Sequence, residues 1–251
     1  MIRKALWVGM GTGAMVALVV ACKPAAKSGA STKGSPVKAA SVGGFQTPES
    51  VKWDSTRDVY FVSNVNGAPS AKDGNGYITR LGPAGMVMDS AFIKGLNAPK
   101  GMALVHDTLW VADIDQVRAF EARTGAPVAT IPLPGAIFLN DIAAAPDGSL
   151  YVTDTAIRFG ANRIFAWKPG ETTTTTLGTG AGQFDGVEIT KDGAVWVSSW
   201  ADSSVYRYAG GQGAKLVKGV PSPADIGYDA RRNRLLVPIF SGNRVEIWQL
   251  Q

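Results

Sequence analysis

The segment PDGSLYVTD, residues 146–154, decides the fold. It joins a polar turn, Pro146-Asp147-Gly148, to a short apolar run that begins at Ser149. Glycine and aspartate favour tight turns, whereas β-branched and aromatic side chains favour strands. The segment KDGAVWVSS at 191–199 has the same layout. This similarity predicts that the two segments are copies of one structural unit.

The apolar strand recurs five times, at intervals of 40 to 50 residues. The copies are DVYFVSN from Asp58, TLWVAD from Thr108, SLYVTD from Ser149, AVWVSS from Ala194 and RLLVPI from Arg234. A second strand follows each copy: GYITRL from Gly76, QVRAF from Gln116, NRIFAW from Asn162, SVYRY from Ser204 and NRVEIW from Asn243. A period of this length with several short strands per unit is typical of propeller blades. We therefore predict an all-β fold, a β-propeller of four-stranded antiparallel blades.

The number of blades follows less directly from the repeats. Five repeats can be counted, and the last has room for only three strands before the C-terminus. We expect the segment around Val42–Gln46 to supply the missing strand and to close the ring. A short blade hidden between Glu49 and Pro99 is the alternative, and it would make six.

The N-terminal 21 residues have the layout of a signal peptide: a basic start, an apolar run and small residues before a cysteine. The run is short for a membrane span, which needs about 20 apolar residues. Val19-Val20-Ala21-Cys22 resembles a lipobox, in which the cysteine is lipidated after cleavage. Cys22 is the only cysteine, so the folded domain has no disulfide. We predict a lipoprotein anchored through Cys22.

Residues 22–44 are rich in Ala, Ser, Gly, Pro and Lys, a composition that predicts a disordered tether before a propeller at 45–251. The chain has a net charge of +5, yet residues 1–44 carry six basic and no acidic side chains. The propeller therefore holds 19 basic and 20 acidic residues and has no basic surface for nucleic acid. We expect a monomer outside the cytoplasm, and Lys23 after the cysteine favours the outer membrane or periplasm over the inner membrane.

An oxygen-bearing side chain stands ten residues before the repeated strand in four of the five repeats. The five positions are Glu49, Pro99, Asn140, Asp185 and Asp225. The inner strand of each blade lines the central channel of a propeller, so we expect these side chains to face one another. Such oxygens suit one divalent cation, Ca²⁺, Mg²⁺, Mn²⁺ or Zn²⁺, and argue against a thiolate-type zinc site. The alternative is a structural pore that holds water.

Three segments resemble the metal-binding blades of the regucalcin and gluconolactonase family: PESVKWD at 48–54, LNDIAAAPDGSLYVTD at 139–154 and FDGVEITKDGAVWVSS at 184–199. Members of that family are six-bladed propellers that hold one divalent cation, and many hydrolyse sugar lactones. The resemblance implies that Glu49, Asn140 and Asp185 bind the metal. The chain departs from the family at Ala98-Pro99-Lys100-Gly101, which stands where the family has a substrate-binding Arg and Asn.

Together these patterns predict a metal-dependent hydrolase of a lactone or similar ester, with Asp185 as general base. Lys100 is expected to bind a substrate carboxylate, to stabilise an oxyanion or to weaken cation binding by repulsion. Asp141 is expected to touch the substrate, and Asp225 to be a channel-wall residue or a further ligand. The only histidine, His106, lies in a predicted surface turn, so a Ser-His-Asp triad is not expected. The alternative function is a non-catalytic propeller that binds a protein or a small molecule.

Overall fold

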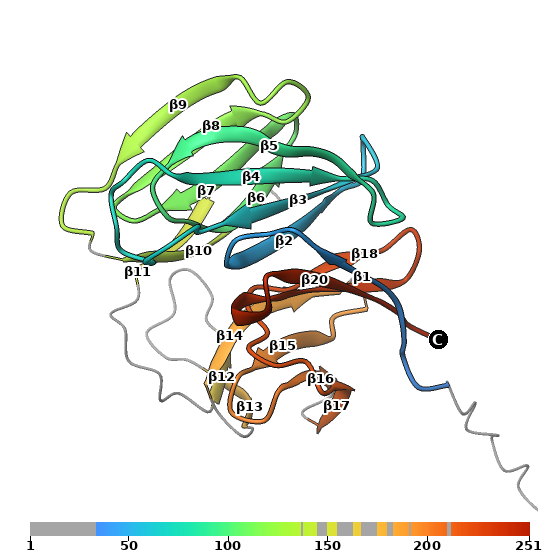
Figure 1. Cartoon of the computed structure of the whole chain (residues 1–251). Helices are drawn as coiled ribbons and strands as arrows, with labels where there is room; N and C mark the ends of the chain where they lie inside the picture. The colour runs from blue at the N-terminus through green and yellow to red at the C-terminus, as the bar shows by residue number, and fades with distance from the viewer. Residues whose placement is uncertain are drawn as a thin grey trace, which may run out of the picture. The chain divides into compact units, whose positions relative to one another are not determined.

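The computed structural model describes residues 34–136, 138–144, 150–154, 163–166, 175–179, 183–190, 192–209 and 212–251. These residues form twenty β-strands and one 3-10 turn, η1 (Phe240–Gly242), and contain no α-helix (Figure 1). Four four-stranded antiparallel sheets lie in a ring as the blades of a β-propeller. The predicted all-β propeller is confirmed. Within the described part of the chain, no helix has the length and apolar character needed to span a membrane.

The sheets follow the order of the sequence repeats. The first contains β2 (Pro48–Asp54), β3 (Val59–Asn64), β4 (Gly76–Leu81) and β5 (Val87–Leu96). The second contains β6 (Pro99–Val105), β7 (Thr108–Asp113), β8 (Gln116–Glu121) and β9 (Pro127–Pro132). Residues 49–99 are all described and contribute no sheet besides the first, so the hidden blade between Glu49 and Pro99 is wrong.

The remaining strands complete the ring. Two pairs stand at the place of the third repeat: β10 (Leu139–Ala144) with β11 (Leu150–Asp154), and β12 (Arg163–Ala166) with β13 (Thr175–Thr179). The next blade contains β14 (Phe184–Ile189), β15 (Val195–Ser199), β16 (Ser204–Ala209) and β17 (Gln212–Lys218). The last contains β18 (Gly227–Asp229), β19 (Arg234–Ile239), β20 (Arg244–Gln249) and the N-terminal strand β1 (Val37–Gly43).

The N-terminal strand closes the last blade, as Figure 1 shows. β1 pairs antiparallel with β20, from Val37 opposite Gln249 to Gly43 opposite Arg244. Closure by the N-terminal segment was expected, but the strand begins before the predicted Val42–Gln46 segment. The C-terminal end of the predicted tether, 22–44, is therefore part of the propeller. The signal peptide, Cys22 and the rest of the tether lie outside the described residues.

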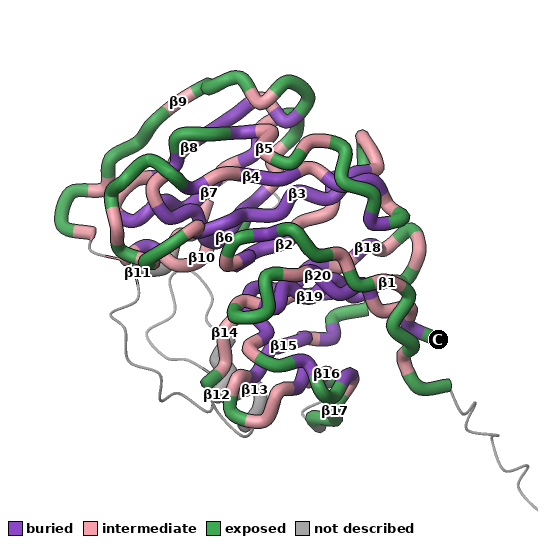
Figure 2. The backbone as a smooth tube through the Cα atoms, viewed as in Figure 1, coloured by how far each residue is buried: buried purple, intermediate pink, exposed green. Residues whose placement is uncertain are grey.

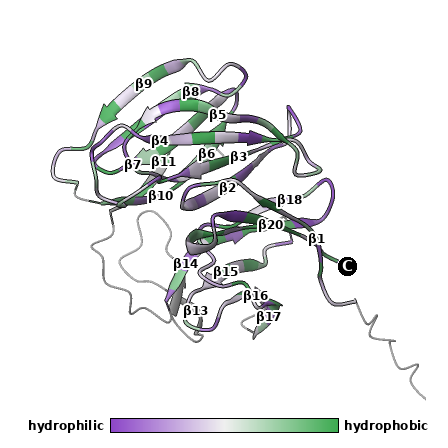
Figure 3. Cartoon of the chain, viewed as in Figure 1, coloured by the Kyte–Doolittle hydropathy of each residue, from purple (hydrophilic) through white to green (hydrophobic). Residues whose placement is uncertain are grey.

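The core lies between neighbouring blades because the middle strands are buried on both faces (Figure 2). In β3, Val59 and Phe61 belong to the apolar cluster shared with the β6–β9 blade. Tyr60 and Val62, which alternate with them, belong to the cluster shared with the last blade. Each large side chain buried in this way stabilises the fold by about 1.5–3 kcal/mol. Figure 3 shows short hydrophobic and hydrophilic patches following one another along the strands.

Trp196 packs between two neighbouring blades. Its ring meets the ring of Tyr228 edge-on, with centroids 4.7 Å apart. Trp196 lies on β15, whereas Tyr228 lies on β18 in the last blade. The contact therefore fixes two neighbouring blades against each other.

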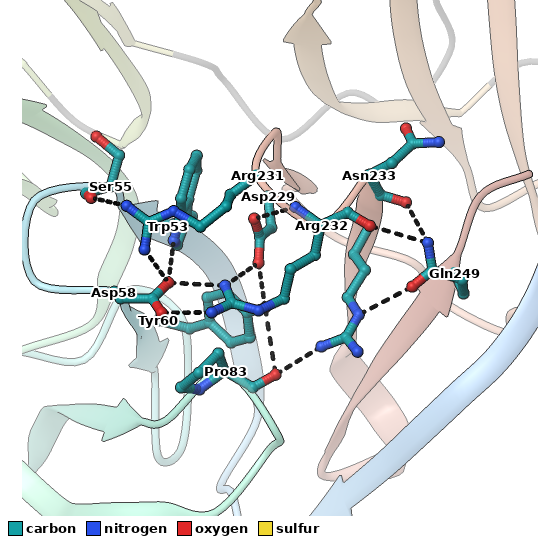
Figure 4. Close-up of polar contacts among 11 residues, drawn as sticks. Trp53, Ser55, Asp58, Tyr60, Pro83, Asp229, Arg231, Arg232, Asn233 and Gln249 are labelled. Atoms are coloured by element: carbon teal, nitrogen blue, oxygen red, sulfur yellow. Dashed lines mark hydrogen bonds and ion pairs between the residues drawn. The ribbon is translucent and has the colours of Figure 1, made fainter.

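An arginine joins the last blade to the first at the turn between β18 and β19 (Figure 4). Asp229 Oδ1 accepts a hydrogen bond from the Arg232 backbone N–H at 3.0 Å, and Asp229 Oδ2 accepts one from Arg232 Nη1 at 2.8 Å. Arg232 Nη2 reaches Asp58, in the turn between β2 and β3. The Tyr60 hydroxyl also donates to Asp229, at 2.6 Å. A charged contact thus reinforces the junction at which the ring closes.

The first blade repeats this arrangement toward the second. Asp54 Oδ1 accepts from the Arg57 backbone N–H at 3.1 Å, and Asp54 Oδ2 accepts from Arg57 Nη1 at 2.7 Å. Arg57 Nη2 reaches Asp107, in the turn between β6 and β7. We call these two Asp-x-x-Arg arrangements the arginine clasps.

Candidate functional site

A β-bulge interrupts the inner strand of each of the four blades that begin with β2, β6, β10 and β14. The register shifts lie between Pro48 and Val51, Pro99 and Met102, Leu139 and Ile142, and Phe184 and Val187. Bulges of this kind re-aim side chains. The first residue inside each is Glu49, Lys100, Asn140 or Asp185, and Asp225 holds the matching position before β18. We call these five residues the polar ring.

The second blade contributes Lys100 to the polar ring. The count of ten residues had predicted Pro99 instead. The turn between β6 and β7 has two residues, whereas the turn between β2 and β3 has four. The shorter turn moves the matching position along the chain. Lys100 stands two residues before the paired Met102, as Glu49 stands two residues before the paired Val51.

The carboxylates of the site lie close enough to repel one another around Glu49. Glu49 is 5% exposed, and its Oε2 atom is buried with no hydrogen-bond partner. Burial raises the pKa of Glu49 well above its usual value, and three carboxylates add to the shift: Asp185, Asp225 and Asp141. The Lys100 ammonium opposes the shift. The structure thus brings most of the predicted site residues together, and it places the half-buried Asn140 in register with them.

Two aspartates of the site titrate near neutrality. Burial, with repulsion from Asp225, raises the pKa of Asp185 to about 7. Trp200 Nε1 donates a hydrogen bond to Asp185 Oδ2 at 2.9 Å and holds the carboxylate in place. Burial and Asp225 also raise the pKa of Asp141 to about 7, although Lys52 opposes the shift. Each group can therefore take up or release a proton at neutral pH.

Asp225 is held by two residues of β2 and forms part of the site's wall. Its Oδ2 accepts a hydrogen bond from Ser50 Oγ at 2.7 Å, and Lys52 Nζ lies 3.1 Å from the same atom. Lys52 Nζ also donates to the Ile226 carbonyl at 3.2 Å and lies 3.9 Å from Glu188. Sequence reasoning missed Ser50 and Lys52, which lie on either side of Val51 in β2.

Lys100 is a buried cation of the polar ring, with 2% of its surface exposed. Its Nζ donates a hydrogen bond to the Ala98 carbonyl at 3.2 Å and lies 4.1 Å from the centre of the Phe138 ring. Burial lowers the pKa of Lys100, whereas attraction by Glu49 and Asp113 raises it. An ammonium group held this close to Glu49 compensates part of the negative charge of the site.

Glycines let the inner strands of neighbouring blades approach each other. A Cβ atom on Gly101 would lie 2.4 Å from Asp141 Oδ1, and one on Gly186 would lie 2.4 Å from Asp225 Cα. Both contacts are far below van der Waals distance, so a larger residue would push the strands apart. The two glycines follow Lys100 and Asp185 directly and thereby allow the site to be compact.

The donor chemistry fits a divalent cation bound by oxygen atoms. Glu49 and Asp185 supply carboxylates, Asn140 supplies an amide oxygen, and the buried Glu49 Oε2 lacks a donor. The part of the chain that is described contains no group of three or more His, Cys, Asp or Glu side chains arranged to hold a metal ion. A cation at this site would therefore rely on the Asn140 oxygen and on ligands from outside the protein.

His106 is exposed in the turn between β6 and β7, where its φ is 52°. This position confirms the prediction of a surface turn. The sequence has no other histidine, so a Ser-His-Asp triad cannot form in the polar ring.

Comparisons with known proteins support the fold alone. No protein-family model matches the chain, and no curated protein matches it in sequence. The solved structure of a luciferin-regenerating enzyme is similar to it, with a TM-score of 0.58 and 12% identity over 86% of this chain and 95% of that one. A nidogen/laminin complex has a TM-score of 0.44 and 16% identity, over 77% and 76% of the two chains, and adds nothing further. The resemblance to the regucalcin and gluconolactonase family therefore rests on the three segments quoted above.

Proposed function

We propose that this chain is a lactonase-like hydrolase that acts at the polar ring with a divalent cation held by Glu49, Asn140 and Asp185. The observation that carries the proposal is the buried Oε2 atom of Glu49, which has no hydrogen-bond partner and lies among repelling carboxylates. A buried acceptor in such a position is costly unless a cation or a ligand satisfies it. The similar luciferin-regenerating enzyme supports an enzymatic use of the fold only by analogy.

The residues of the site suit ester hydrolysis. A bound cation would polarise the substrate carbonyl and make a nearby water more acidic. Asp185 accepts the proton of the attacking water, since it is a carboxylate of the same site that Trp200 holds in place. The Lys100 ammonium stabilises the negative charge that develops on the carbonyl oxygen. The ring C–O bond then breaks, and the leaving oxygen takes the proton back from Asp185.

The place of action is a second part of the proposal. We propose that Cys22 carries a lipid that holds the propeller outside the cytoplasm, at the outer membrane or in the periplasm. The lipobox and the signal-peptide layout of the leader support it. Metabolic labelling with a radioactive fatty acid, compared between the wild type and Cys22→Ala, tests this proposal. Unlabelled wild-type protein would contradict it.

The alternative is a binding module without catalysis. Lys52 and Lys100 already compensate Asp225 and Glu49, and this observation favours a site that needs no metal. Such a site would hold a small polar molecule by the Lys100 ammonium and the Asp141 carboxylate. The two functions differ in whether bound substrate is converted.

The experiment that tests the proposed function measures bound metal and turnover of several lactones with added Ca²⁺, Mg²⁺, Mn²⁺ or Zn²⁺. Asp185→Ala is expected to lower kcat/KM at least about 100-fold, because it removes a ligand and the general base. Asp115→Ala is the matched control, since Asp115 is a surface carboxylate that pairs with the exposed Lys72. Metal-free protein that hydrolyses no lactone would rule out the hydrolase and leave the binding module.

A further inference from the structure

Three half-buried aromatic rings border the polar ring. Phe138 lies under the Lys100 ammonium, 4.1 Å from its ring centre. Trp200 donates its Nε1 hydrogen bond to Asp185. Phe240 packs against Trp200, with ring centres 5.5 Å apart and planes inclined by 54°. We call Phe138, Trp200 and Phe240 the aromatic collar.

The collar is part of a border of apolar side chains at one end of the blades. Equivalent positions of the sequence repeat supply these side chains. Trp200 and Phe240 directly follow β15 and β19, as Val65 and Ile114 directly follow β3 and β7. Three of these residues donate backbone hydrogen bonds to the segments that lead into the inner strands: Val65 to Thr47, Trp200 to Gln183 and Phe240 to Ser222. Val65 and Ile114 form one apolar cluster with Ala98, and Phe240 packs against it. Apolar side chains therefore surround the same end of the inner strands that carries the polar ring.

The polar atoms of this border are already engaged. Trp200 Nε1 is bound to Asp185, and the phenylalanine rings have no hydrogen-bonding group. A polyhydroxylated sugar needs donors and acceptors around its ring, whereas an aromatic ligand gains from flat apolar faces. The charged groups that could meet a carbonyl or carboxylate, Lys100 and Asp185, each touch a collar residue.

We propose that the ligand of this site is a compound whose carbonyl group is attached to an aromatic or similarly flat apolar ring, in preference to a sugar lactone. The catalytic part of this inference rests on the proposed function, whereas the binding part does not. The ring of the ligand stacks against the aromatic collar, and its carbonyl group faces Lys100 and Asp185.

The test compares three lactones: dihydrocoumarin, which carries a fused aromatic ring, δ-valerolactone, which has the same lactone ring without it, and gluconolactone. Because the phenol released from dihydrocoumarin is a better leaving group than an alkyl alcohol, part of its higher kcat/KM is intrinsic to the substrate. The collar is therefore tested by the ratio of the dihydrocoumarin value to the δ-valerolactone value, which a change in the collar should lower. Phe240→Leu keeps an apolar side chain but removes the flat ring, and it should lower the dihydrocoumarin value several-fold more than it lowers the δ-valerolactone value. Phe92→Leu is the matched control, because Phe92 is a half-buried ring that stacks on Phe61 away from the collar.

A binding measurement separates failure of this inference from failure of the proposed function. Calorimetric titration with 3-(2-hydroxyphenyl)propanoate, the hydrolysis product of dihydrocoumarin, reports ligand preference without turnover. Binding that Phe240→Leu weakens supports the aromatic ligand even when no lactone is hydrolysed. Equal or better turnover of gluconolactone overturns the inference and leaves the hydrolase standing. Absence of both aromatic binding and aromatic turnover also overturns it.

Discussion

Lys100 gives the polar ring a positive charge of its own. Its ammonium is buried beside Glu49 and over the Phe138 ring, so it cannot leave the site without exposing both. A fixed internal cation stabilises the carboxylates when no ligand is bound, and it competes with any metal that binds to the same oxygens. In the proposed cation site, Lys100 is therefore the residue that we expect to set the affinity for the metal.

Replacing Lys100 by methionine should strengthen cation binding. Lys100→Met keeps the length of the side chain but removes the charge, so a divalent cation no longer meets repulsion. We expect the dissociation constant for the preferred cation to fall about tenfold, which corresponds to about 1.4 kcal/mol. Calorimetric titration with metal measures it, and Lys94→Met, on the exposed part of β5, is the control. Unchanged affinity in Lys100→Met would place the cation away from this residue.

The raised pKa of Asp185 predicts a stability that falls as the pH rises. Its pKa is about 7 in the folded protein and about 3.8 in the unfolded chain, so the folded state binds more protons between these values. The free energy of unfolding of the metal-free protein should therefore fall from pH 4 to pH 7, by up to about 1.4 kcal/mol per pH unit for this group.

Asp185→Asn should flatten this pH dependence, because it removes one titrating group. Urea unfolding in the presence of a chelator, at several pH values, measures the slope. Asp115→Asn on the surface should leave the slope as it is in the wild type. A slope equally steep in Asp185→Asn would show that this carboxylate does not cause it.

The two arginine clasps share the same arrangement of side chains. In each, an aspartate at the end of the inner strand holds the arginine three residues later, and that arginine reaches the turn of a neighbouring blade. Buried carboxylates held in this way depend on their partner, because a lone buried charge is costly. The clasps lie at the ends of the inner strands β2 and β18. They therefore fix the blades at the end opposite to the aromatic collar.

Removing the arginine at the ring closure should be costly. Arg232→Ala leaves Asp229, which is fully buried, without its charged partner. We expect a loss of about 3 kcal/mol in the free energy of unfolding. Arg231→Ala is the matched control, since its side chain is half exposed and should cost about 0.5 kcal/mol. Similar losses in both variants would contradict a special role for the clasp.

The same clasp predicts a contribution that is lost in acid. The hydrogen bond from Arg232 lowers the pKa of Asp58 to about 2, against 3.8 in the unfolded chain. This contribution is present above about pH 4 and disappears as the pH falls through 2. Asp58→Asn should therefore destabilise the protein by about 1–2 kcal/mol at pH 7 and by much less at pH 2.5, as measured by urea unfolding. A difference that does not change with pH would contradict this assignment.

The strand β1 makes the whole ring depend on a segment with little apolar surface. It adds mainly Ala40 and Val42 to the core, and it covers the edge of β20. A chain that begins at residue 34 should unfold like the full chain. A chain that begins at residue 44 loses β1, and we expect its free energy of unfolding to fall by at least about 2 kcal/mol. Thermal unfolding of the two truncated proteins measures this, and equal stability would show that β1 does not close the ring.

Sequence patterns were enough for the fold because each repeat carries its own turn and apolar strand. The count of ten residues agrees with the strand register at Glu49 and Asp185, where the hairpins that follow have similar lengths. The position in the second blade was wrong because the short turn at 106–107 changes the count. β1 was missed because small side chains such as those around Ala40 do not distinguish an edge strand from a tether. The clasps between blades could not be predicted, since Arg57 and Arg232 reach Asp107 and Asp58 only after the blades have come together.

Closure by β1 has a mechanical consequence for the proposed anchoring through Cys22. A pull from such an anchor would enter the fold at Val37, which pairs with Gln249 near the C-terminus. The load therefore reaches the two ends of the chain at once and acts first on the hydrogen bonds between β1 and β20. A steady force in this direction would open the last blade before it disturbed the inner strands.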